Sequence, residues 1–253
     1  MLKKYITKII LLFLCKGTIA FATSNIQKLK IAYPNHIKEI AENKIIFHDN
    51  SALLFDDKKE KNFFKKLINP SLKDQMSIKY TSVLENENYI PKKNEDPGRI
   101  RNYQFFKKIY GATQKEIKQN LIKIKWMPQT INKTLYVTTV NNIHEKLKKV
   151  SNELDKLSPE LKQFVNNPAG TYKHREIAGT NRLSMHSYGI AIDINVNKSH
   201  YWKWDKKKNK FKHKNLIPLK IVKIFEKEGF IWGGRWFHYD TMHFEYRPEL
   251  LIN

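Results

Sequence analysis

Two histidines and two aspartates in the last third of the 253-residue chain have the types and spacing of a hydrolytic metal site. His186 is followed by Asp193, and Asp240 precedes His243 by three residues. Two histidines and one carboxylate are the number and type of protein ligands that a catalytic zinc ion takes, which leaves a fourth position for water. A second carboxylate near a ligating histidine could accept a proton from that water. His186, Asp193 and His243 are therefore candidate metal ligands, and Asp240 is a candidate base.

The same residues have a simpler interpretation. The chain contains 9 histidines, so accidental pairings are easy, and a single histidine is more often structural than ligating. Glycines and aromatic residues are frequent around both segments, as is typical of tight turns between packed strands. Two histidines and a carboxylate can also bind divalent ions other than zinc, because geometry and availability select the metal. The spacing alone therefore does not decide whether these residues form a metal site or have a structural role.

Two short strands would have to position these side chains. In residues 190–195 three isoleucines alternate with other residues, so the isoleucines are expected to face the core and Asp193 to project from the opposite face. A carboxylate flanked by β-branched residues needs a cation, an arginine or a metal as its partner. His243 begins a second strand-like run, residues 243–246. Glu245 would share the face of His243, where it could orient a ligand or simply be solvated or salt-bridged.

The elements that would support these strands are predicted from apolar periodicity and turn residues. The predicted helices are 58–68, 114–122, a helix that begins at about residue 143, a short turn at 158–165 and a helix at 218–229. A further strand is predicted at 134–140.

The chain is strongly basic, with 47 Lys and Arg against 24 Asp and Glu and a formal charge of +23. Such a charge favours nucleic-acid binding at low salt. However, the chain has no Cys/His finger, no RRM-type aromatic signature and no Walker loop. The basic surface could instead bind cell-wall polymers or acidic lipid headgroups, or have no dedicated partner. The densest basic run, residues 203–214, is predicted to be a solvated loop.

The first 22 residues have the pattern of a secretory signal peptide. Three lysines precede the apolar run 9–15, and Ala20-Phe21-Ala22 has the small-x-small form of a cleavage site. We expect cleavage after Ala22 and export to the periplasm or cell envelope. An uncleaved anchor is the alternative, although Lys16 interrupts the apolar run too early for a membrane span. The remaining 231 residues would carry +19 and no cysteine, so their stability must come from the core or a metal.

Two blocks of the sequence closely resemble the zinc D-alanyl-D-alanine carboxypeptidases and L-alanyl-D-glutamate endopeptidases of the M15 peptidase group, including its VanY-like branch. The first block is S-M-H-S-Y-G-I-A-I-D at 184–193. The second is W-G-G at 232–234, followed by D-T-M-H-F-E at 240–245. Members of that family cleave peptidoglycan stem peptides, so the resemblance implies this substrate class.

The resemblance also implies a role for each matched residue. His186, Asp193 and His243 would ligate one Zn²⁺ ion, and Asp240 would be the general base. Many relatives have glutamate at the position of Asp240, so the shorter side chain would have to reach the zinc-bound water. Arg175 would contact the substrate carbonyl and its developing oxyanion, for which a loss of about 10²–10³ in turnover is typical when one donor is removed.

Substrate contacts are also implied, with alternatives. Ser184 lies where relatives hold a substrate carboxylate or backbone, but it could cap a turn. Trp232, Trp236 and Tyr239 could line a substrate groove, or they could be packing residues. Arg175 could be a surface or salt-bridging arginine, and Arg182 competes with it for the oxyanion role.

We therefore expect an α+β domain with a small, mostly antiparallel sheet that carries the zinc site and is packed with helices. The expected division is a signal peptide at 1–22, an N-terminal extension of unknown role at 23–95 and a zinc peptidase domain at 96–253. The expected function is zinc-dependent hydrolysis of peptidoglycan peptides, without a nucleic-acid partner and without a transmembrane span in the mature chain. The alternatives are a non-catalytic cell-wall or zinc-binding module of the same fold, a basic nucleic-acid or lipid-binding protein, and an enzyme of the same fold that acts on a free dipeptide or a non-wall peptide.

Overall fold

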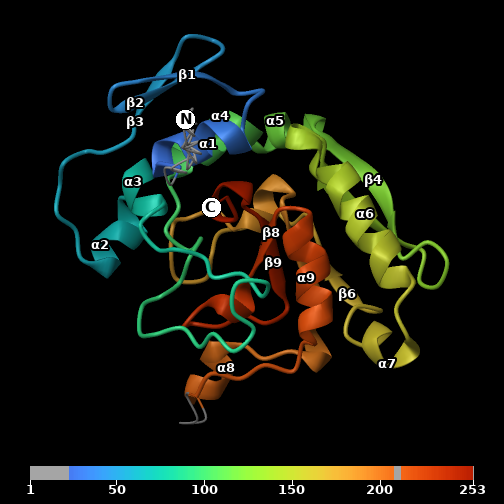
Figure 1. Ribbon diagram of the computed structural model, residues 1–253. Coiled ribbons are helices and arrows are strands. Elements are labelled where there is room, and N and C mark those ends of the chain that lie inside the picture. The colour runs from blue at the N-terminus through green and yellow to red at the C-terminus, as the bar shows by residue number, and fades with distance from the viewer. Residues whose placement is uncertain (1–22, 208–211, 253) are drawn as a thin grey trace, which may run out of the picture.

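The computed structural model describes residues 23–207 and 212–252. Helices surround small antiparallel sheets (Figure 1), which confirms the predicted α+β class. The predicted signal peptide and its cleavage site after Ala22 lie outside the described residues, as do four positions of the basic segment 203–214. None of the helices in the described ranges is long and apolar enough to cross a bilayer.

A four-stranded antiparallel sheet near the centre of the molecule carries the candidate site (Figure 1). Its strands, in spatial order, are β6 (Pro168–Gly170), β7 (Ala191–Asn195), β9 (His243–Tyr246) and β8 (Phe230–Trp232). The predicted alternation in β7 is confirmed, because the isoleucines at 192 and 194 are fully buried while the side chain of Asp193 is 23% exposed. Helix α9 (Leu219–Lys227) packs against this sheet through Phe225, whose ring stacks on Phe244 at 3.9 Å between centres.

A second antiparallel pair supports the sheet from the side of β7. Strands β4 (Leu121–Trp126) and β5 (Lys133–Thr138) form a hairpin, and the amide of Thr138 donates to the carbonyl of Gly189 at 3.2 Å. The predicted strand 134–140 is therefore present over most of its length. The predicted helix 114–122 is shorter, because α5 ends at Gln119 and Leu121 already pairs with Thr138. Helix α6 (Ile143–Asp155) begins where predicted and packs on β4.

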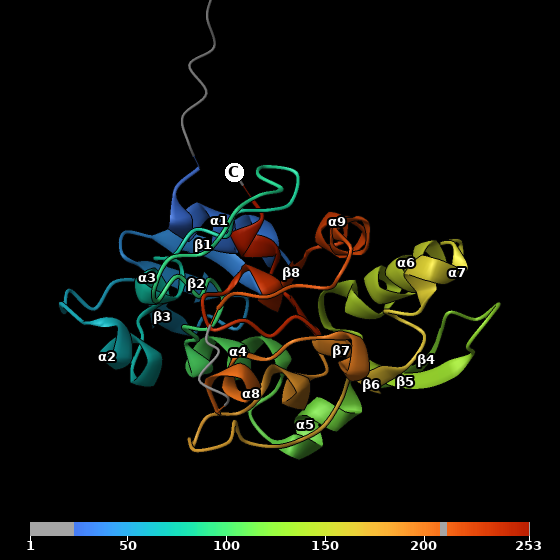
Figure 2. The ribbon, with the colours of Figure 1, turned by 90° about the horizontal axis from the view of Figure 1, so that it is seen from below.

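The helices and strands of residues 23–110 lie mainly on one side of the molecule (Figures 1 and 2), whereas the loop that ends at residue 102 reaches helix α9, where Lys223 binds Glu87. Their elements are α1 (Asn25–Ala32), β1 (Ile37–Ala41), β2 (Lys44–Phe47), β3 (Ala52–Leu54), α2 (Phe63–Ile68), α3 (Leu72–Gln75) and α4 (Tyr103–Tyr110). The predicted helix 58–68 is present only from Phe63 onward. Leu29, Tyr33 and Val83 are fully buried in the same core as the central sheet. The boundary after residue 95 stays a prediction, and apolar packing runs across it.

Buried polar contacts join the two ends of the chain. The hydroxyl of Tyr33 donates to Glu249 at 2.8 Å, and that of Tyr80 donates to Glu226 at 2.6 Å.

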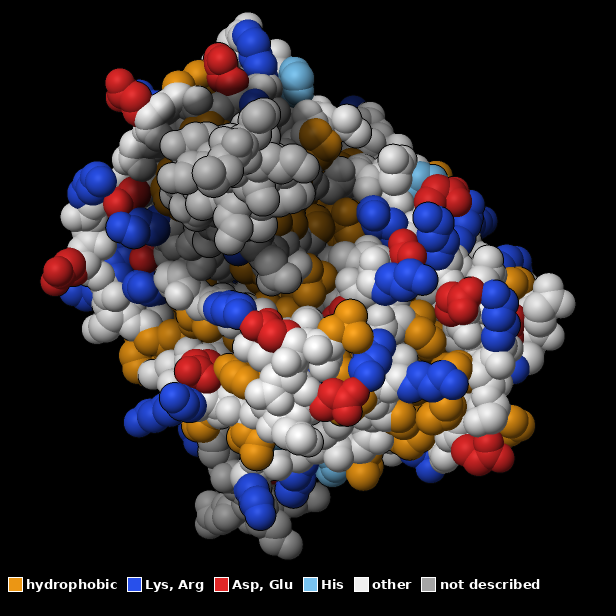
Figure 3. Space-filling model, in the orientation of Figure 1, with side chains coloured by type: hydrophobic (Ala, Val, Ile, Leu, Met, Phe, Trp, Pro, Cys, Tyr) orange, Lys and Arg blue, Asp and Glu red, His pale blue; other side chains and the backbone are white. Residues whose placement is uncertain are grey.

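The remaining short helices and turns are α7 (Pro159–Lys162), α8 (Trp202–Lys207), η1 (Val140–Asn142), η2 (Met185–Tyr188), η3 (Val196–Lys198), η4 (Gly233–Arg235) and η5 (Pro248–Leu250). On the face in Figure 3, lysine and arginine side chains are scattered among acidic and apolar ones and form no continuous basic patch.

Candidate metal centre and active-site cleft

The pairing of β7 with β9 brings two of the candidate ligands together. Asp193 lies directly opposite His243 in the antiparallel register. His186 reaches the same place from the turn η2, which ends at Gly189 with φ 68°. A Cβ atom at Gly189 would lie 2.7 Å from a side-chain carbon of Leu121, so this turn needs glycine both for its backbone conformation and for space.

The ligand-type atoms of His186, Asp193 and His243 all lie within 4.8 Å of one another. His243 Nδ1 is 2.9 Å from Asp193 Oδ1, and His186 Nε2 is 3.1 Å from the same oxygen. His186 Nε2 is buried and has no hydrogen-bond partner within the described structure. Two nitrogens that converge on one carboxylate oxygen, one of them without a hydrogen-bond partner among the described residues, are the donor set of a divalent ion such as zinc. The three residues present therefore fit a metal.

The outer nitrogen of each histidine is held by a partner, which fixes the nitrogen that faces the centre. His186 Nδ1 donates to the carbonyl oxygen of Thr171 at 2.6 Å, so Nε2 keeps its lone pair for a metal. His243 Nε2 donates to Glu245 Oε2 at 2.9 Å, which leaves Nδ1 for the centre. Such partners of ligating histidines set the tautomer and the ring orientation of a metal site.

Glu245 is fully buried and sits in a network of charges behind His243. Its carboxylate accepts from Arg101 Nη2 at 2.5 Å and from Arg247 Nη1 at 3.1 Å. Burial raises the pKa of Glu245, but the positive charge of Arg101 and the hydrogen bond from His243 outweigh it and hold the pKa well below its usual value. The sequence left three roles open for Glu245: orienting a ligand, being solvated or being salt-bridged. Its complete burial shows that the solvated interpretation is wrong. The residue is salt-bridged, and it also orients His243.

The acidic surroundings of His243 favour a positive charge at this position. Burial lowers the pKa of His243, but its hydrogen bonds to Asp193 and Glu245 raise it to about 10. Burial likewise raises the pKa of Asp193, and the two histidines together hold it well below its usual value. A proton or a metal ion can supply the charge that these carboxylates require.

Asp240 is a half-buried residue beside this cluster, and its Oδ1 atom is buried. Its Oδ1 has no hydrogen-bond partner among the described residues, and burial raises its pKa to about 6. The loop that holds Asp240 depends on the W-G-G segment. The amide of Asp240 donates to the carbonyl of Gly233 at 3.0 Å, and a Cβ at Gly233 would lie 2.4 Å from the carbonyl oxygen of Asp240. A carboxylate with a pKa raised toward neutrality and an unused oxygen is suited to proton transfer.

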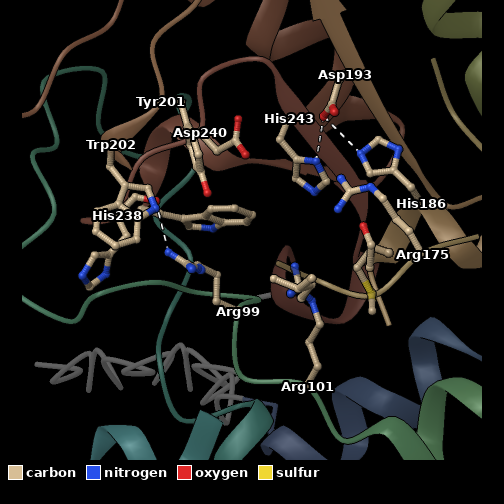
Figure 4. Close-up of a pocket in the computed structure, with 14 residues that line it drawn as sticks. Arg99, Arg101, Arg175, His186, Asp193, Tyr201, Trp202, His238, Asp240 and His243 are labelled. Carbon is tan, nitrogen blue, oxygen red and sulfur yellow. Dashed lines mark hydrogen bonds and ion pairs between the residues drawn. The ribbon is translucent and has the colours of Figure 1, made fainter. Parts of the chain in front are cut away.

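The cluster lies in a cleft that encloses about 580 Å³, including its open mouth. Figure 4 shows Arg175 next to His186 and Arg99 on the far side of the cleft from the histidines. Arg101 shares the Glu245 carboxylate oxygen with His243. The lining residues are Arg99, Arg101, Arg175, Ile177, Ser184, Met185, His186, Asp193, Tyr201, Trp202, Trp236, His238, Asp240 and His243. The cleft therefore combines three arginines and three aromatic residues with the candidate metal cluster and Asp240.

Arg175 and Ser184 both line the cleft, and Arg182 does not. The Arg175 backbone is fixed to the turn η2, because its amide donates to Ser187 Oγ at 3.0 Å and its carbonyl accepts from the Ser184 amide at 3.0 Å. Its side chain is exposed to the cleft. Ser184 makes no capping hydrogen bond through its side chain. Arg182 Nη1 instead donates to the carbonyl of Leu67 at 2.9 Å, away from the cleft.

The structure does not bring Trp232 and Tyr239 into the cleft lining. Both side chains are buried, with Trp232 Nε1 donating to the carbonyl of Thr241 at 2.9 Å and the Tyr239 hydroxyl donating to Asp205 at 2.6 Å. Trp232 thereby anchors the loop that carries Asp240. The aromatic side chains that do line the cleft come from Tyr201, Trp202 and Trp236.

Reasoning from the sequence missed Arg99 and Arg101. They follow Asp96-Pro97-Gly98, residues typical of a turn, but nothing in the spacing of residues 96–101 connects them with a site more than eighty residues later. Their position depends on contacts such as the one from Arg247 Nη1 to the Gly98 carbonyl at 2.7 Å.

Residues 178–246 match the family model of the D-alanyl-D-alanine carboxypeptidases of the M15 peptidases. This segment is similar to the M15 family, and the match covers residues 178–246 of the 253-residue chain. No curated protein and no solved structure matches the chain. The M15 match contains His186, Asp193, Asp240 and His243, and it begins after Arg175. The cleft is thus completed by residues from outside the matched segment.

Proposed function

We propose that this chain is an exported zinc peptidase that hydrolyses peptidoglycan stem peptides. The observation that carries the proposal is the convergence of His186, Asp193 and His243 within the M15 match. Beside them lies Asp240, whose buried Oδ1 has no hydrogen-bond partner among the described residues. The predicted signal peptide supports export, since stem peptides lie outside the cytoplasmic membrane. The bond would be D-Ala-D-Ala or L-Ala-D-Glu.

In the proposed site each residue has a distinct task. A zinc ion held by His186, Asp193 and His243 would supply Lewis acidity, which lowers the pKa of water and polarises a carbonyl group. Asp240 would accept the proton of the attacking water and return it to the leaving nitrogen. Arg175, which lines the cleft beside His186, would donate to the oxygen of the scissile carbonyl as its negative charge develops. Glu245 would keep His243 in the orientation that presents Nδ1.

The test is digestion of purified peptidoglycan by residues 23–253, with the products identified by mass spectrometry. Metal-stripped protein, zinc-restored protein and Asp240→Asn are compared, because asparagine keeps the shape of aspartate but cannot accept the proton. Release of D-Ala, or of fragments cut between L-Ala and D-Glu, should require zinc and be lost in the variant. Zinc-loaded wild type that cuts neither bond, although it holds one zinc per chain, would leave a non-catalytic zinc or cell-wall module as the function.

A further inference from the structure

A series of buried polar contacts leads from His243 into the interior of the protein. Glu245 binds His243 and is itself bound by Arg247, as described above. Arg247 is fully buried, and its Nε donates to Glu249 Oε1 at 2.6 Å. Glu249 is also fully buried, and its other oxygen, Oε2, accepts from the hydroxyl of Tyr33 at 2.8 Å. These contacts connect a candidate metal ligand with the end of helix α1, about 210 residues earlier in the sequence.

Both carboxylates in this series are bound at both of their oxygen atoms. Glu245 Oε1 accepts from Arg247 at 3.1 Å, while Oε2 accepts from His243 at 2.9 Å. Glu249 divides its two oxygens between Arg247 and Tyr33 in the same way. The two oxygens of a carboxylate both accept hydrogen bonds and move together as one planar group. A shift of the Tyr33 hydroxyl would therefore be passed on to the ring of His243.

Helix α1 fixes Tyr33 in a rigid environment. Tyr33 directly follows α1, and its amide donates to the carbonyl of Leu29 at 3.0 Å. Its ring packs edge-on against Phe105, with 5.1 Å between ring centres. Helix α1 lies beside η5 in the C-terminal segment (Figure 2), and η5 carries Glu249. Burial and the negative charge of Glu249 hold the pKa of Tyr33 well above its usual value, so the hydroxyl keeps its proton and donates.

A second buried tyrosine makes a comparable contact that leads elsewhere. The hydroxyl of Tyr80 donates to Glu226 on α9 at 2.6 Å and accepts from the amide of Trp232 at 3.1 Å. Glu226 also accepts from the amide of Val83 at 2.9 Å. Tyr33 and Tyr80 thus both tie the N-terminal region to the C-terminal third through a buried glutamate. Among the described hydrogen bonds, only those of Tyr33 continue to the partner of a candidate metal ligand.

We propose that Tyr33 positions His243 for metal binding through Glu249, Arg247 and Glu245, so that helix α1 is a working part of the metal centre. The inference rests on the metal site of the proposed function and does not depend on hydrolysis. It gives a role to the segment that contains α1, which lies outside the M15 match at 178–246. Tyr33 does not line the cleft, so it is a positioning residue.

The test compares zinc affinity in residues 23–253 as wild type, Tyr33→Phe and Tyr80→Phe, by competition against a chelator. Each variant removes one hydroxyl from a buried hydrogen bond to a glutamate, so urea unfolding of the metal-free proteins should show similar losses of stability. Only Tyr33→Phe should weaken zinc binding, by about 3- to 10-fold. This is less than the loss of about 10- to 100-fold that is typical when the direct partner of a ligating histidine is removed.

Two further measurements follow the route of the effect. With Co²⁺ in place of zinc, the visible absorption bands depend on ligand geometry and should change in Tyr33→Phe but not in Tyr80→Phe. Glu245→Gln should itself weaken zinc binding, and adding Tyr33→Phe to that variant should have no further effect, because the route passes through Glu245.

The outcomes separate this inference from the proposed function. Equal zinc affinity of Tyr33→Phe and Tyr80→Phe overturns it, and so does a loss from Tyr33→Phe that is as large in the Glu245→Gln background as in the wild type. A wild type that binds no zinc overturns both proposals. A selective loss of zinc affinity in Tyr33→Phe supports the role of Tyr33 even if the zinc-loaded wild type cuts no peptidoglycan, and in that case only the proposed hydrolysis fails.

Discussion

Replacing Arg101 with methionine should weaken zinc binding, although Arg101 is not a ligand in the proposed site. Arg101 Nη2 holds Glu245 Oε2 at 2.5 Å, and the same oxygen accepts from His243 Nε2 at 2.9 Å. Without Arg101 this carboxylate oxygen is free to shift, because Arg247 binds the other oxygen, Oε1. Loss of a partner behind a ligating histidine typically lowers metal affinity about 10- to 100-fold, and we expect a loss in that range.

The same variant should also destabilise the fold. Breaking a buried ion pair costs about 3–5 kcal/mol, and the lower end applies here because Arg247 still compensates Glu245. The assays are zinc competition against a chelator of known affinity and urea unfolding of the metal-free protein. Arg182→Met is the control, since it removes another partly buried arginine that links distant segments but has no contact with Glu245.

A specific pair of results would refute this reasoning. If Arg101→Met loses stability but binds zinc as tightly as Arg182→Met, then Glu245 does not orient His243 through Arg101. The buried charges would then serve only to join residues 96–110 to β9 (His243–Tyr246).

Four further predictions follow from the site and its supports. Arg175→Gln should lower kcat by about 10²–10³ with zinc affinity unchanged, since Arg175 is expected to act on the oxyanion alone; a change in KM alone would assign it to binding. Asp240→Asn should stabilise the metal-free protein by up to about 3 kcal/mol at pH 8, because burial raises the Asp240 pKa to about 6 and ionisation of the wild type therefore opposes folding. This gain should shrink as the pH falls from about 6 to about 4, where the native carboxyl group is already protonated, and pH-independent urea unfolding differences would contradict it. Gly189→Ala should cost about 1–3 kcal/mol in unfolding free energy, because φ is 68° and the new Cβ would meet Leu121 at 2.7 Å; an unchanged melting temperature would show that the turn adapts. A chain that begins at residue 96 should fail to fold cooperatively, because it loses core residues such as Tyr33; a sharp thermal transition for that fragment would show that 96–253 folds alone.

The local pattern of the sequence determined the parts of the site that lie on regular strands. Alternating isoleucines predicted the face on which Asp193 projects, and this follows from the two-residue period of a strand. Glycine in the S-x-H-x-x-G and W-G-G segments marked turns whose backbones leave no room for a side chain. The resemblance to M15 peptidases picked out His186, Asp193 and His243, and the structure brings their ligand atoms together. Their catalytic roles, with that of Asp240, stay predictions.

Only the tertiary structure decided which residues surround that cluster. Arg99 and Arg101 reach the cleft through contacts with residues about 140 positions later, and no local period encodes a contact at such a separation. The burial of Glu245 likewise depends on two arginines from different segments. Trp232 and Tyr239 looked equivalent to Trp236 in the sequence, yet only Trp236 lines the cleft, because the loop around Asp240 turns the other two rings into the interior. Sequence periodicity sets which way a side chain leaves its strand or turn, whereas the packing of distant segments sets what it meets there.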